Sequence, residues 1–167
     1  MKYFKYVLIA ILLHLTIVFF PYSPSYPQYI TGSPPLMQYA VKVFADAKRL
    51  GYTPPKFNTL TLQFSAESPD VNKDTGNTTI GYTTGYNSDF PLITINIITW
   101  IQMNSEQRYL LIAHEMGHAI WKRDHDETLL PDFTQKSIMA PVMFNVDIFK
   151  KKRDYYLREL FDHTGDL

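Results

Sequence analysis

Residues 110–120 read Leu-Leu-Ile-Ala-His-Glu-Met-Gly-His-Ala-Ile, a largely apolar stretch that contains the pattern H-E-x-x-H. His114 and His118 are four residues apart, so on an α-helix they share one face and can offer two imidazole nitrogens to one metal ion. Glu115 lies about 100° round the helix from His114, close enough to reach a water bound at that metal without being a ligand. The alternative is a helix with these three side chains on a solvated face, which fits poorly because the flanking residues leave almost no solvated face. The stretch therefore predicts a metal site on a mostly buried helix.

Composition fits one globular domain. The chain has 167 residues, of which 46% are hydrophobic and 15% aromatic, enough for a sizeable core. Its 16 basic and 16 acidic residues give a formal net charge of zero, so no overall electrostatic case exists for a nucleic-acid partner. Without cysteine, the chain has no disulfide, no thiolate metal ligand and no cysteine nucleophile.

The first twenty residues differ from the rest. Lys2 and Lys5 are followed by an almost wholly apolar run, so residues 1–20 are expected to be a signal peptide or a membrane anchor. No small-residue cleavage site follows, and prolines surround the expected cut, which favours the uncleaved anchor. In either case the lysines keep the N-terminus in the cytoplasm, so the protein is expected to be exported, either anchored in the membrane or secreted. Residues 21–35 predict a linker to a domain of residues 36–167.

Local patterns place the other elements. A helix is expected from Pro34 to Leu50, with Ser33 as its N-cap. Alternation predicts strands at 59–64 and 93–97, and a β-prone stretch with two glycines predicts a bent or edge strand at 78–86.

Two further helices are expected after these strands. Asn104 and Gln107 have the spacing of a capping box at the start of the helix that carries the histidines. The last helix is expected over residues 145–161, with Tyr155 and Tyr156 among its inward side chains and residues 150–153 on its solvated face.

A polar loop separates the strands expected at 59–64 and 78–86. Asp70-x-Asn72-x-Asp74-x-Gly76 resembles the start of a calcium-binding loop, although the glycine falls one position late and no glutamate closes the loop. Asp, Asn and Gly also form ordinary turns. A Ca²⁺ site and a plain polar turn therefore both remain as interpretations.

The segment after the histidine helix carries a family resemblance. Trp-Lys-Arg-Asp-His occupies residues 121–125, and Ser-Ile-Met-Ala-Pro occupies residues 137–141. With these residues the chain resembles the metzincins, zinc endopeptidases with H-E-x-x-H-x-x-G-x-x-H followed by a methionine turn. Within that group it is most similar to the matrixins, whose motif ends in Asp-His. The resemblance covers roughly residues 58–161.

The third ligand is left open by the spacing. Strict spacing puts Trp121 in place of the family glycine and Asp124 at the ligand position. One inserted residue puts His125 there instead, which agrees with the Asp-His ending and with imidazole as the commoner ligand. Another residue such as His163 is the remaining alternative.

The resemblance implies an α+β, metzincin-like zincin domain: a small mixed twisted sheet, an active-site helix, a methionine turn at Met139 and a C-terminal helix. It implies one Zn²⁺ held by His114, His118 and His125, with Met139 as an apolar floor. Glu115 would act as general base in hydrolysing peptide bonds of a protein or peptide substrate, bound along the strand at 79–86.

Two alternatives of other classes remain. One is an exported binding module, catalytically inactive and stabilised by zinc, which has no need of the intact Glu115. The other is a zinc hydrolase that acts on a non-peptide bond, which the methionine turn disfavours.

Overall fold

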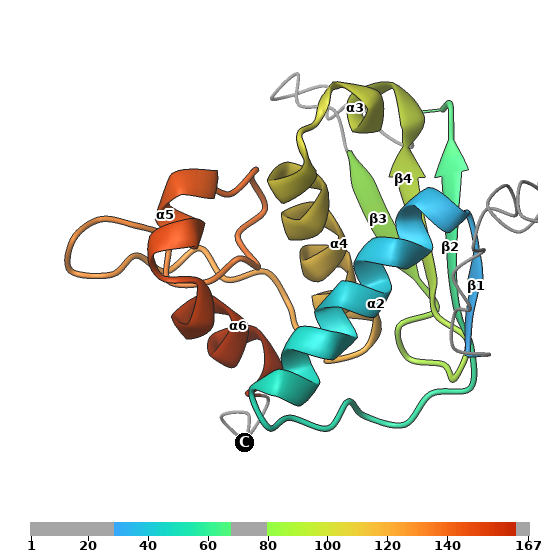
Figure 1. Ribbon diagram of the computed structural model, residues 1–167, viewed down its shortest axis with the longest axis horizontal. Coiled ribbons are helices and arrows are strands. Elements are labelled where there is room, and N and C mark those ends of the chain that lie inside the picture. Colours follow the sequence, from blue (N-terminus) through green and yellow to red (C-terminus); the bar gives the residue numbers. More distant parts are fainter. Residues whose placement is uncertain (1–28, 68–79, 163–167) are drawn as a thin grey trace, which may run out of the picture.

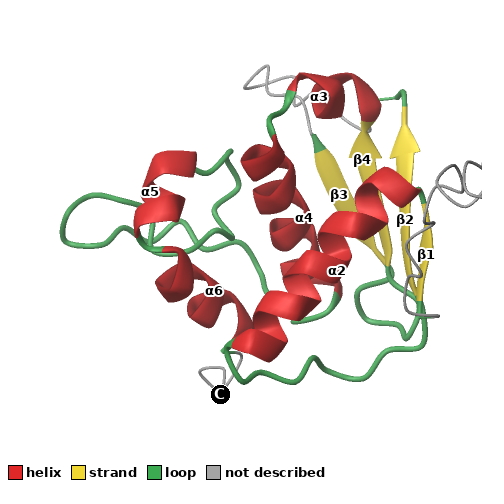
Figure 2. Cartoon of the chain, viewed as in Figure 1, coloured by secondary structure: helices red, strands yellow, loops and turns green. Residues whose placement is uncertain are grey.

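The computed structural model describes residues 29–67 and 80–162, which form a small mixed sheet and five helices (Figures 1 and 2). The predicted α+β class with a small mixed sheet is therefore confirmed. The predictions for residues 1–20, for most of the linker, for the calcium-like loop and for His163 lie outside the described residues. Among the helices described, none has the length and apolarity needed to span a membrane.

The sheet has the strand order β1-β2-β4-β3. β2 (Leu60–Ser65) runs parallel to β4 (Leu92–Asn96), and β3 (Gly81–Thr84) pairs antiparallel with β4. The strands expected at 59–64 and 93–97 are thus confirmed within one residue. β3 lies at the edge of the described sheet, as expected, but it spans only part of the predicted 78–86. β4 is flanked by β2 and β3, and its residues from Ile93 onward are all buried.

A fourth strand, β1 (Ile30–Gly32), occupies part of the expected linker. It pairs parallel with β2, with Ile30 opposite Leu60. A Cβ on Gly32 would lie 1.9 Å from the carbonyl oxygen of Leu62, so only glycine fits there. The linker prediction for 21–35 is therefore wrong over these residues, because a three-residue strand ending in glycine has no periodicity to detect.

Three helices pack beside the sheet. α2 (Pro34–Arg49) packs against α4 (Ser105–Ala119), and the short α3 (Ile97–Gln102) connects β4 to α4 (Figure 1). Ser33 occupies the N-cap of α2, although its side chain makes no capping hydrogen bond. The capping box of Asn104 and Gln107 is confirmed, with hydrogen bonds in both directions.

The C-terminal segment differs from its prediction. It forms two helices, α5 (Val146–Lys151) and α6 (Arg153–Phe161), because Lys152 leaves the helical region at φ −122° and ψ 30°. Tyr155, expected to point inwards, is 41% exposed, because the break changes the phase of the helix that follows it. Arg153, expected on the solvated face, lies over the rings of Tyr109 and Phe149 instead.

Candidate metal centre

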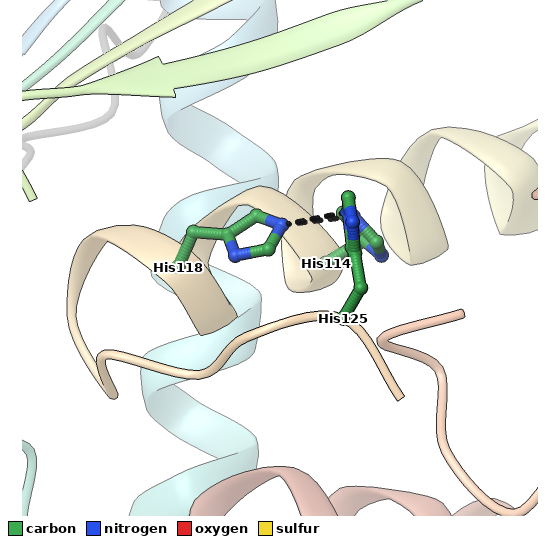
Figure 3. Close-up of side chains that lie close together, drawn as sticks. All are labelled: His114, His118 and His125. Atoms are coloured by element: carbon green, nitrogen blue, oxygen red, sulfur yellow. Dashed lines mark hydrogen bonds between the residues drawn. The ribbon is translucent and has the colours of Figure 1, made fainter. Parts of the chain in front are cut away.

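Three histidine rings meet at the C-terminal end of α4 (Figure 3). Nε2 of His118 lies 3.2 Å from Nε2 of His114 and 3.2 Å from Nε2 of His125. The ring nitrogens of the three residues lie within 4.8 Å of one another, close enough to bind one metal ion. Asp124, the alternative from strict spacing, is exposed and is not part of this group.

The ring nitrogens that face away from the cluster, Nδ1 of His114 and Nδ1 of His118, determine which nitrogens can bind a cation. Nδ1 of His114 lies 2.8 Å from the carbonyl oxygen of Ile138, and Nδ1 of His118 lies 2.6 Å from that of Arg123. A carbonyl accepts only, so each Nδ1 carries the proton and each neutral ring turns an Nε2 lone pair towards its neighbour. Facing lone pairs at 3.2 Å repel unless a proton or a metal ion lies between them. The donor set and its outer hydrogen bonds therefore suit a divalent metal.

The turn after α4 has its left-handed residue one position later than strict metzincin spacing predicts. Lys122, not Trp121, takes the left-handed conformation, at φ 56°. Lys122 stands three residues before His125, the same offset that separates the metzincin glycine from its histidine. Trp121 instead points into the core, 1% exposed, against Phe44 and Phe161. The interpretation with His125 as third ligand therefore places its extra residue between His118 and Lys122.

Met139 lies under the same helix and is fully buried. A Cβ on Gly117, the residue before His118, would lie 2.4 Å from the sulfur of Met139 and 2.9 Å from Cδ1 of Leu160. Glycine therefore lets the methionine pack directly on the backbone of α4 between the two ligands. Met139 is thus buried against the helix that carries His114 and His118, and its role as an apolar floor for a metal stays a prediction.

The side chain of Glu115 extends from α4 and contacts the edge strand β3. Thr83 donates its hydroxyl hydrogen to Oε2 of Glu115 over 2.8 Å, and the same hydroxyl lies 3.1 Å from the Glu115 carbonyl oxygen. A Cβ on Gly81 would lie 2.9 Å from Oε1, so this glycine leaves room for the carboxylate. Burial raises the pKa of Glu115 to about 7, while the Thr83 hydrogen bond acts in the opposite direction. A carboxyl group with this pKa can accept and return a proton near neutral pH.

A carboxylate from α6 connects the two loops around the histidines. Glu159 accepts hydrogen bonds from the Arg123 guanidinium and, over 2.6 Å, from the Ser137 hydroxyl. The same hydroxyl accepts from the Met139 amide over 3.0 Å. Arg123 supplies the carbonyl that orients His118. Glu159 therefore helps to orient His118, a candidate ligand, through Arg123.

Replacing Glu159 by Gln is expected to weaken metal binding roughly 10- to 100-fold, the range typical of groups that orient metal ligands. The amide keeps the volume but loses the charge that holds Arg123, so the Arg123 carbonyl no longer holds His118 as firmly. Competition with a chromogenic chelator measures this. Arg158→Gln, an exposed change on the same helix, is the control, and equal affinities in both variants would contradict the prediction.

The stability of the metal-free protein is expected to depend on two opposed titrations. Burial lowers the pKa of His114 from 6.5 to about 4, so between these values the unfolded chain holds more protons and stability rises with pH. The pKa of Glu115 is raised from 4.5 to about 7, so in that range the folded chain holds more protons and stability falls as pH rises. The His114 and Glu115 slopes offset each other between about pH 4.5 and 6.5, and burial also lowers the pKa of His118, which adds to the rise of stability with pH.

Replacing Glu115 by Gln removes the Glu115 titration, and with it the fall of stability with rising pH. The metal-free stability of this variant should rise with pH more steeply than that of the parent, by up to about 1.4 kcal/mol per pH unit for one proton. Urea unfolding with chelator at several pH values between 4.5 and 6.5 tests this. Parallel curves for the two proteins would contradict the opposed titrations.

The sequence predicted that the three histidines, Glu115 and Met139 belong to one site. It did not predict Thr83 and Glu159, which orient Glu115 and Arg123. Thr83 lies 32 residues from Glu115, and Glu159 lies 36 residues from Arg123, so no local pattern joins them. Gly81 did carry a signal, because a glycine within a β-prone stretch often marks a close approach of another group. Comparisons of the chain with models of protein families, with curated proteins and with solved structures find no match.

Proposed function

We propose that this chain is a zinc-dependent endopeptidase of the metzincin type. The observation that carries the proposal is the grouping of three imidazole nitrogens beside a buried carboxylate that follows the first histidine on the same helix. Three protein ligands leave a fourth position open, which is the pattern of catalytic rather than structural zinc. Imidazole also suits copper, iron and nickel, so the choice of zinc rests on the resemblance.

The residues around the histidines have complementary tasks in this proposal. Zinc, when bound by His114, His118 and His125, supplies a Lewis acid that polarises the scissile carbonyl and makes water more acidic. Glu115 takes the proton from the attacking water and returns it to the leaving amine. Thr83 holds the Glu115 carboxylate during this transfer. The outer edge of β3 pairs with no strand within residues 29–67 and 80–162, so its main-chain groups can bind an extended peptide and the substrate lies beside Glu115.

The proposal includes a location outside the cytoplasm. It rests on the basic and apolar character of residues 1–20, either as an anchor that keeps the domain at the membrane or as a signal that is removed. The competing function is an exported binding module that holds zinc for stability. That module has no use for a carboxylate with a raised pKa next to a ligand, and this observation favours the peptidase.

Cleavage of an unfolded protein mixture by the full-length protein in detergent is the test. Zinc-loaded protein should produce fragments, a chelator should stop the cleavage, and added zinc should restore it. A folded, zinc-loaded protein that cuts nothing would support the binding module instead.

A further inference from the structure

A concave surface lies at the C-terminal end of α2, away from the histidine cluster. It is an open pocket of about 490 Å³ between that helix, the start of β1 and the loop before β2. Its walls are mainly aromatic and prolyl, with two lysines: Tyr29, Phe44, Lys48, Tyr52, Pro54, Pro55, Lys56 and Phe57, together with Thr53.

The aromatic side chains of this pocket form an ordered set. The rings of Phe44 and Phe57 stack at 5.7 Å and 10°, and Tyr29 meets both edge-on at 5.9 and 5.5 Å. Aromatic surfaces of this kind hold prolyl rings and other flat apolar groups, as in domains that bind proline-rich segments. Tyr29 remains 41% exposed, so part of this surface is available to a ligand.

The charges on the pocket are positive. Lys48 and Lys56 are exposed, and neither has an ion-pair partner within residues 29–67 and 80–162. The nearby Asp46 is already engaged by Arg49 and Arg153. Lys48 can be explained as complementing the dipole at the end of α2, but Lys56 lies in a loop and has no such role. The pocket therefore suits a ligand with negative charge beside apolar groups.

We propose that this pocket docks an extended polypeptide segment in which proline or aromatic residues alternate with acidic ones. A small-molecule site normally encloses most of its ligand, whereas this pocket is open and suits a chain that runs across it. The proposal goes beyond the peptidase, because docking requires neither zinc nor cleavage.

The pocket is connected to the turn that carries the third histidine. The ring of Phe44 lies 6.1 Å from that of Trp121, which immediately precedes the left-handed Lys122. A segment held in the pocket would contact Phe44, and through that ring it would be linked to Trp121, which does not itself line the pocket.

The test uses the full-length Glu115→Gln protein in detergent, so that no probe is cleaved. The probe is the fluorescein-labelled peptide Asp-Pro-Pro-Asp-Pro-Pro-Asp, followed by anisotropy. Its matched comparators carry Lys for each Asp, or Ser for each Pro. The pocket variant is the double change Lys48→Glu and Lys56→Glu, and the control is Lys150→Glu and Lys151→Glu, two exposed lysines on α5.

The acidic proline peptide should bind more tightly than both comparators. Reversing the pocket charges should weaken its binding about tenfold or more and turn the preference towards the lysine peptide, while the α5 control should change neither. Equal losses in pocket variant and control, or serine and proline peptides of equal affinity, would overturn the proposal. It would also fail if replacing Pro21, Pro24 and Pro27 by Ser raised the affinity, because the chain itself would then occupy the pocket.

Discussion

Replacing Glu115 by Gln is expected to lower kcat by about 10²- to 10⁴-fold while zinc remains bound. Glu115 is not among the grouped ring nitrogens, so a metal bound by the three histidines would keep all of them. The amide keeps the shape and still accepts the Thr83 hydroxyl hydrogen, but it cannot take a proton from water. Turnover of a quenched-fluorescence peptide and zinc content by atomic absorption give the two measurements.

A neighbouring acid provides the control for that experiment. Glu127 is exposed in the loop after His125, so Glu127→Gln makes the same chemical change without touching the centre. It should leave both activity and zinc content unchanged. Loss of zinc from Glu115→Gln would give the carboxylate a structural role and would favour the zinc-stabilised module. Unchanged turnover would show that another group accepts the proton.

Local sequence predicted those parts of the centre that lie on one element. His114, Glu115 and His118 share one helix, and its start is fixed by a capping box only four residues long, so spacing alone determined their geometry. His125 required more, because a loop absorbs one residue without altering its pattern. Only the structure shows that Lys122 is the turn residue.

The contacts of Thr83 with Glu115 and of Glu159 with Arg123 could not be predicted from the sequence, for a different reason. Thr83 meets Glu115 because β3 pairs with β4 and lies beside α4, and this depends on a sheet order that places β4 between β2 and β3. Glu159 lies on α6, which begins after the break at Lys152, and its hydrogen bond with Arg123 joins two segments 36 residues apart. Such contacts depend on tertiary packing, which a pattern in one element does not record.

Trp121→Gly would place a glycine where the metzincin motif has one, yet it is expected to destabilise the protein by about 4 kcal/mol. Trp121 is among the largest fully buried side chains, and its ring packs 4.8 Å from Phe161 and 6.1 Å from Phe44. Removing it leaves a cavity that these aromatic rings cannot fill. Urea unfolding with a chelator present measures the loss without a contribution from bound metal.

The adjacent change Lys122→Gly should have a much smaller effect, within about 1 kcal/mol. Glycine relieves the left-handed backbone at φ 56°, but it removes hydrogen bonds from the lysine ammonium to the carbonyl oxygens of Ala119 and Tyr86. The two effects oppose each other. If Trp121→Gly were the tolerated change and Lys122→Gly the damaging one, the turn would lie at residue 121 and strict spacing would hold. Asp124 would then be the third ligand, and Asp124→Asn rather than His125→Ala would release zinc.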